Sequence, residues 1–241
     1  KEDCFEFHES IRAEISPILK ELSEKRKASL GLEHLKPWDL ECDVDGKAAL
    51  KPFEDGKVLL QKTKTVFGKI DPYFEECLQV MENMGHLDLE SRLGKSPGGY
   101  NYPLYEIGVP FIFMNAAGTQ SDLVTMVHEG GHAVHSFLTR TLKITSFKSF
   151  PSEVAELASM SMELISMDHW DVFYSDPSEL KRAKIDQLER CLSVLPWVAI
   201  IDKFQHWLYE NPKHSNEERI AQWKLITTSI SPSIVNWDGI E

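Results

Sequence analysis

The sequence has 241 residues, of which 42% are hydrophobic and 27% are charged, as in an ordinary globular protein. Its formal net charge of −12 argues against general binding to nucleic acids or anionic membranes, because those surfaces repel an acidic protein. No apolar run approaches the ~20 residues that a bilayer-spanning helix needs.

Four cysteines are spread along the chain without a CxxC pair, so a cysteine zinc site and a thioredoxin-like motif lack support. They are Cys4, Cys42, Cys77 and Cys191. This usage predicts reduced, mostly buried thiols in a cytoplasmic protein. The chain begins at Lys1 without a methionine and ends in NWDGIE without an obvious closing element, so we expect a fragment of a longer polypeptide.

The first third of the chain is expected to be helical. Apolar spacing in residues 5–28 predicts a helix that Pro17 kinks or divides and that Gly31 ends. After a loop punctuated by proline and glycine, further helices are expected at about 56–67 and 72–83.

The periodicity changes after the flexible segment GKSPGG at 94–99. Residues 100–108 and 109–115 form short aromatic and β-branched runs bounded by proline and glycine, which predicts a small hairpin or two strands. A helix is then expected to start at Thr119, with Asp122 facing the free amides of its first turn.

Three helices are expected after a connection at 139–150. The first follows Ser152 as its cap, the second is long and bent at Pro196, and the last starts after Ser215 and ends near Ser229. The expected fold is therefore mainly α, with one small β-sheet directly before the helix that begins at Thr119.

That helix contains HEGGH at 128–132, which has the spacing of a metal site. His128 and His132 are four residues apart, so on a helix their imidazoles share one face, about 5–6 Å apart at Cβ. Glu129 is rotated by about one hundred degrees, so it reaches a water beside the ion rather than the ion itself. Imidazoles with a carboxylate suit Zn²⁺.

The alternative is a polar patch on an ordinary helix. Apolar residues flank the motif and predict a buried helix, in which histidine and glutamate are costly unless they have partners. Gly130 and Gly131 cost roughly 1 kcal/mol each against alanine, which indicates that another element approaches the backbone there.

A zinc hydrolase keeps three protein ligands and one open position, so a third ligand is expected. Glu156 is the best candidate because it lies among apolar residues on the next helix; a surface charge is the alternative. Glu153 is expected to be a surface acid, and Glu163, on the same face as Glu156, to support a ligand.

A donor for the oxyanion of the tetrahedral intermediate is also required. The candidates within the chain are His135, Tyr100, Tyr102 and Tyr105, and none stands out; His135 is expected to be a core or supporting histidine. The strand at 109–115 is expected to pair a free edge with an extended peptide.

Several segments together resemble the oligoendopeptidase F branch of the thimet oligopeptidase family of zinc peptidases. They are PWDL, GKSPGGY, PFIFMNAAGT, DLVTMVHEGGHAVHSF and FPSEVAELASMSMEL, and the resemblance spans residues 37–240. It implies a helical zincin-type catalytic domain, with His128, His132 and Glu156 as ligands of one zinc ion and Glu129 as the catalytic glutamate. It also implies a channel that admits peptides, and an oxyanion-binding segment beyond this chain.

Residues 1–241 are accordingly expected to be a partial catalytic domain, with a helical segment at 1–90 leading to the sheet and zinc-binding helices at 91–241. The expected function is zinc-dependent endopeptidase action on short, unstructured peptides in the cytoplasm, without nucleic-acid or membrane partners. Oligomeric state and substrate residues stay open. The alternatives are a zinc-stabilised but catalytically silent peptide-binding module, a truncated inactive fragment, and a helical domain that holds no ion.

Overall fold

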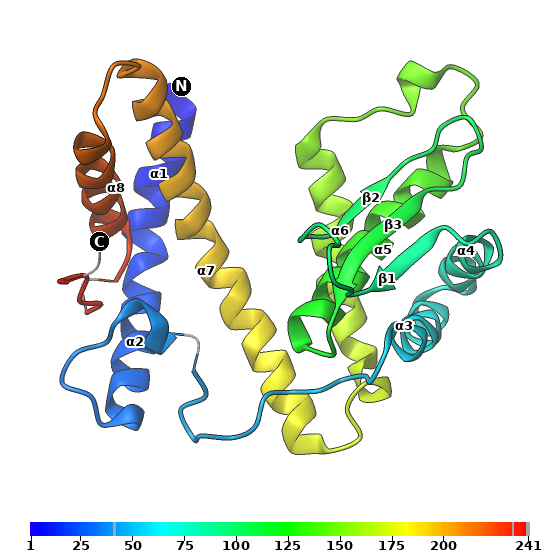
Figure 1. Cartoon of the computed structure of the whole chain (residues 1–241), viewed down its shortest axis with the longest axis horizontal. Coiled ribbons are helices and arrows are strands. Elements are labelled where there is room, and N and C mark those ends of the chain that lie inside the picture. The colour runs from blue at the N-terminus through cyan, green and yellow to red at the C-terminus, as the bar shows by residue number, and fades with distance from the viewer. Residues whose placement is uncertain (41, 233, 240–241) are drawn as a thin grey trace. The chain divides into compact units, whose positions relative to one another are not determined.

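The structure is a computed structural model that describes residues 1–40, 42–232 and 234–239 (Figure 1). The end of the NWDGIE segment, Ile240 and Glu241, therefore lies outside the described residues.

The chain folds as two compact units. Unit 1 combines residues 1–48 with residues 185–241, and unit 2 comprises residues 49–184. This grouping follows contacts in space, whereas the division expected at residue 90 followed chain order.

Unit 2 contains a three-stranded sheet of order β1-β3-β2, formed by β1 (Leu87–Glu90), β2 (Tyr100–Tyr102) and β3 (Phe111–Ala116). β2 runs antiparallel to β3, which confirms the expected hairpin, and β1 runs parallel to β3. The expectation that the strand at 109–115 offers a free edge is wrong, because β3 is central and pairs on both sides.

Four α-helices, two short 3₁₀ helices and the start of a helix that continues into unit 1 complete unit 2 in the described residues. The helices that lie wholly in unit 2 are α3 (Gly56–Ile70), α4 (Pro72–Asn83), α5 (Gln120–Thr139), α6 (Ser152–Ser166), η2 (Thr145–Phe147) and η3 (Met167–Val172). The expected helices at 56–67 and 72–83 are confirmed. The helix expected to follow Ser152 begins one residue earlier, because Pro151 occupies the cap position, and it ends at Ser166.

The core of unit 2 forms around α5. Alternate residues of β3 are buried, among them Ile112 and Met114, and the fully buried Phe67, Leu123 and Met126 belong to the same hydrophobic cluster. α5 begins at a capping box in which the Thr119 and Asp122 side chains bond each other's backbone N–H groups, as expected. Figure 1 shows α5 lying across one face of the sheet.

Unit 1 is helical. It contains α1 (Glu2–Glu14), α2 (Ser16–Leu30), η1 (Pro37–Leu40), most of α7 (Pro177–Glu210) and α8 (Asn216–Ile230). The first expected helix is divided at Ile15, just before Pro17, and ends at Gly31 in the left-handed conformation (φ 65°). Pro196 lies inside α7, and Ser215 caps α8 as expected.

Unit 1 has a small hydrophobic core between α1, α7 and α8. Its buried members are Ile11, Ala199, Ile200, Ile226 and Ile230. Leu35 forms an isolated parallel bridge with Val235.

Two expectations about the cysteines have different outcomes. All four are free thiols, but the expectation that they are mostly buried is wrong, because Cys4 and Cys42 are exposed and only Cys77 is fully buried. Burial raises the pKa of the Cys77 thiol to about 11.

None of the helices in the described part of the chain combines the length and apolar character that crossing a membrane requires.

Candidate metal and peptidase site

The two histidines of HEGGH lie side by side on α5. Their ring centroids are 4.9 Å apart and their planes are nearly perpendicular. This arrangement follows from the four-residue spacing, which places His128 and His132 on successive turns of one helical face.

Glu156 on α6 meets both imidazoles. Its Oε2 lies 3.3 Å from His128 Nε2 and 3.6 Å from His132 Nε2. The ligand atoms of these three residues all lie within 4.8 Å of one another. The structure therefore brings together the three side chains that the sequence singled out as metal ligands.

The two glycines of the motif allow neighbouring helices to lie close to α5, and Gly131 in particular admits the helix that carries Glu156. A Cβ at Gly131 would lie 2.9 Å from the Ala158 carbonyl oxygen and from Ser159 Cα, so only glycine lets α6 pack this close to α5. A Cβ at Gly130 would lie 2.6 Å from the Phe67 ring of α3. The expected close approach by neighbouring elements is confirmed at both glycines.

Glu163 holds the first histidine from its other side. Its Oε1 lies 2.6 Å from His128 Nδ1, while His128 Nε2 faces Glu156. Burial lowers the pKa of His128, but the Glu163 hydrogen bond and the nearby carboxylates outweigh it, so the net pKa is raised. The pKa of His132 is lowered, first by burial and then by the charge of His128.

Glu129 is buried, with 7% of its surface exposed, beside the sheet rather than among the three grouped side chains. The backbone of Asn101 in β2 lies near its carboxylate and favours the charged form. Burial raises the pKa of Glu129, and the charge of His128 only partly offsets that effect. Such a carboxylate is a stronger proton acceptor than an ordinary surface glutamate.

The surroundings of Glu156 differ from the expected core-like helix. Val154 and Leu157, its apolar neighbours, are exposed, and the Glu156 side chain is itself 46% exposed. Its Oε2 accepts a hydrogen bond of 2.9 Å from the Ser159 hydroxyl, a contact that sequence reasoning missed. Glu153 is exposed, as expected.

The candidate oxyanion donors differ in their surroundings. His135 stacks on Phe150 with ring centroids 3.9 Å apart, and burial lowers its pKa. Tyr100 stacks on Phe113 in the sheet, and Tyr102 is largely exposed. The structure singles out none of these as the donor.

A small sheet packed on an HExxH helix, followed by a helix that brings a glutamate to both imidazoles, is the arrangement of mainly helical zincin-type peptidases. The family model "Peptidase family M3" matches residues 1–237, and the chain belongs to this family. Membership in this family of metallopeptidases implies a bound metal, and the group of His128, His132 and Glu156 provides ligands for one.

Individual relatives agree with this assignment. The chain is 30% identical over 149 residues to an oligoendopeptidase F homolog of Lactococcus lactis, covering 62% of this chain and 24% of that protein. It is 30% identical over 150 residues to oligopeptidase PepF of Bacillus subtilis, covering 62% and 22%. The solved structure of PZ peptidase A with an inhibitor superposes with a TM-score of 0.91 at 28% identity, covering 100% of this chain and 42% of that one. The chain thus spans about a quarter of these curated relatives.

Proposed function

We propose that this chain carries the catalytic centre of a zinc-dependent metalloendopeptidase that hydrolyses short, unstructured peptides. The observation that supports this most directly is the position of one oxygen, Glu156 Oε2, between His128 Nε2 at 3.3 Å and His132 Nε2 at 3.6 Å. Zinc–ligand bonds of about 2.0–2.2 Å at tetrahedral angles separate neighbouring ligand atoms by about 3.3–3.6 Å. The two nitrogens and the oxygen therefore fit the donor set of one zinc ion.

His128, His132 and Glu156 would hold this ion. When bound, zinc supplies a Lewis acid that polarises the scissile carbonyl and makes water a better nucleophile near neutral pH. The chain contributes the positioning: α5 fixes the imidazole pair, and Glu163 fixes the orientation of the first ring through Nδ1.

Glu129 would act as the general base and then as the general acid. Its carboxylate takes a proton from the attacking water and later donates that proton to the leaving amine nitrogen. The raised pKa that burial gives this carboxyl group favours the first transfer, because the group takes up a proton more readily than a solvated glutamate does.

The substrate backbone would lie along β2. β2 is an edge of the sheet, and its Asn101 backbone lies near the Glu129 carboxylate. An extended peptide that added to this edge through main-chain hydrogen bonds would pass close to Glu129. Main-chain recognition agrees with an enzyme that accepts many side chains.

Cytoplasmic location and the absence of nucleic-acid and membrane partners stay predictions.

The test is Glu129→Gln in the natural polypeptide that carries this chain. Hydrolysis of an internally quenched short peptide should fall by at least about 100-fold, because general acid–base catalysis typically contributes 10²–10⁴-fold. Zinc content, measured by elemental analysis of the same preparation, should stay at its wild-type value because glutamine leaves the three ligands intact.

Glu106→Gln is the matched control, since it makes the same chemical change at an exposed position. It should leave hydrolysis unchanged. If Glu129→Gln lost zinc as well as activity, the proposed role of Glu129 as a general base would be wrong. A zinc-loaded wild-type protein without hydrolysis would instead support the silent peptide-binding module.

A further inference from the structure

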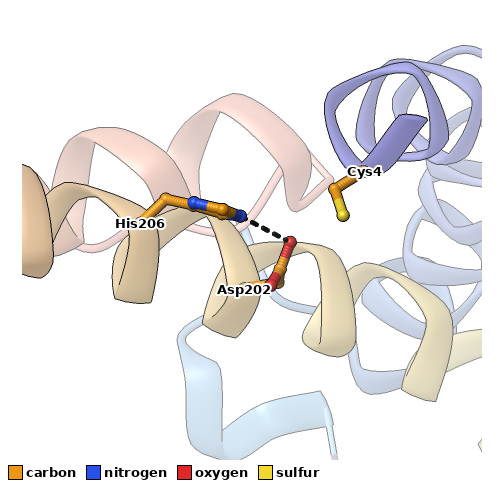
Figure 2. Close-up of side chains that lie close together, drawn as sticks. All are labelled: Cys4, Asp202 and His206. Carbon is orange, nitrogen blue, oxygen red and sulfur yellow. Dashed lines mark ion pairs between the residues drawn. The ribbon is translucent and has the colours of Figure 1, made fainter. Parts of the chain in front are cut away.

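Unit 1 contains a second group of metal-ligating side chains, remote in sequence from HEGGH. The ligand atoms of Cys4 on α1 and of Asp202 and His206 on α7 all lie within 4.8 Å of one another. Figure 2 shows the thiol, the carboxylate and the imidazole directed toward a common space. Asp202 and His206 are four residues apart on one helix, the same spacing as the histidine pair of α5.

A fourth residue holds the carboxylate in place. His8 Nε2 lies 2.8 Å from Asp202 Oδ2, and His8 is only 1% exposed. His8 Nδ1 is buried and has no hydrogen-bond partner within the described residues, so the proton is best placed on Nε2, where it is donated to Asp202. The carboxylate keeps further lone pairs for a cation.

The rings are also fixed relative to each other. The centroid of the Phe5 ring lies 5.5 Å from that of His8 on α1 and 5.3 Å from that of His206 on α7. The i,i+4 pair of Cys4 and His8 on α1 therefore faces the i,i+4 pair of Asp202 and His206 on α7. An ordinary ion pair between Asp202 and His206 would not require a thiol beside it.

The donor set specifies the class of ion. A thiolate and an imidazole favour zinc and similar divalent transition metals, whereas magnesium and calcium prefer oxygen ligands alone. The distance of 3.7 Å between His206 Nε2 and Asp202 Oδ2 is near the ligand separation of about 3.4 Å in tetrahedral zinc. Cys4 is exposed and lies in the first turn of α1, so its side chain is free to rotate onto an ion.

We propose that Cys4, Asp202 and His206 form a second binding site for Zn²⁺ or Co²⁺, with Asp202 oriented by His8. A bound ion would join α1 to α7, whose shared hydrophobic core is small. Metal ligation is a common means of stabilising such a small core. The site shares no residue with the group of His128, His132 and Glu156, called the HEGGH group below, and differs from it by its sulfur ligand.

Cobalt binding to the whole chain tests this site without reference to peptidase activity. Titration with Co²⁺ should give two bound ions per chain and a near-ultraviolet charge-transfer band from thiolate to cobalt, which the sulfur-free HEGGH group cannot produce. Cys4→Ser should abolish that band and weaken binding of one ion by about 100-fold or more, because even partners outside the ligand shell contribute about 10–100-fold.

Cys42→Ser is the matched control, since Cys42 is also an exposed thiol but bonds the Asp39 carbonyl instead. It should keep the band and both ions. Zinc should likewise protect Cys4, but not Cys42, from alkylation by a maleimide. The proposal is overturned if wild-type protein shows no charge-transfer band or if the band persists in Cys4→Ser. It is also overturned if His206→Gln leaves both the band and the cobalt affinity of this site unchanged.

Discussion

His128 uses both of its ring nitrogens in the site. Nε2 faces Glu156 at 3.3 Å, and Nδ1 lies 2.6 Å from Glu163. A carboxylate on Nδ1 stabilises the tautomer that carries its proton there, which leaves the Nε2 lone pair directed at the other two ligand atoms. In the proposed zinc site, Glu163 would therefore orient the ring for the metal before the metal binds.

Glu163→Gln should weaken zinc binding by about 10–100-fold, because glutamine removes the negative charge that increases the basicity of His128. Competition with a chromophoric chelator measures this change. Glu153→Gln, on the exposed start of the same helix, should leave zinc affinity at the wild-type value. If Glu163→Gln left zinc affinity unchanged, the short contact between Glu163 and His128 would have no role in metal binding.

At this scale, local spacing determines what the sequence reveals. The pairing of His128 with His132 needs only a helix, so four-residue spacing predicts it. The hydrogen bond from Ser159 to Glu156 and the approach of the Asn101 backbone to Glu129 were not predicted. The first depends on a side-chain rotamer and the second on how β2 packs against α5, and neither leaves a periodic signal in the sequence.

Among the elements, the packing of α6 on α5 controls the geometry of the site. Gly131 permits this packing because a Cβ there would meet the backbone of Ala158 and Ser159 at 2.9 Å. Backbone atoms cannot rotate away as a side chain can, so any larger residue must push α6 outward. Glu156 would move with it, away from both imidazoles.

Gly131→Ala should therefore destabilise the protein by about 1–2 kcal/mol, because overpacking costs about 1–3 kcal/mol against a gain of up to about 1 kcal/mol in helix propensity. Zinc affinity should fall in the same variant. Denaturant unfolding and zinc competition measure the two effects. Gly68→Ala in α3 is the control, since its added Cβ meets mainly the flexible side chain of Glu75. Equal effects in the two variants would show that backbone contact is not the cause.

The sequence predicts helices well where capping residues mark their ends. Gly31, Thr119 and Ser215 end or cap helices at the expected places because capping needs only a few neighbouring residues. β1 was missed, since LDLE is four residues long and its alternation is too short to distinguish a strand from a loop. The aromatic and β-branched composition of residues 109–115 identified β3 as a strand without showing that it has neighbours on both sides.

At the scale of the whole molecule, chain order does not show which segments fold together. Residues 1–48 join residues 185–241 in unit 1, although 136 residues of unit 2 lie between them in sequence. The group of Cys4, Asp202 and His206 therefore forms no local sequence motif, because its members become neighbours only in the folded chain. The HEGGH group and its glutamate, by contrast, lie within one unit and within one stretch of sequence.

Zinc at the HEGGH group should stabilise the folded chain, because the ion joins α5 and α6 only when unit 2 is folded. At a free zinc concentration 100 times the dissociation constant, the expected stabilisation is about 2.7 kcal/mol. This corresponds to a rise in melting temperature of about 5–11 °C for a chain of this length. Thermal unfolding of Cys4→Ser, followed by circular dichroism, measures the rise without a contribution from the second site.

A chelator should reverse this rise, and His132→Gln should remove most of it because one of three ligands is lost. Magnesium should have no effect, since it prefers oxygen ligands. If zinc bound stoichiometrically but left the melting temperature unchanged, it would bind folded and unfolded chains equally well. The close approach of Glu156 to both imidazoles would then contribute nothing to metal binding, and the geometric basis of the proposed peptidase centre would fail.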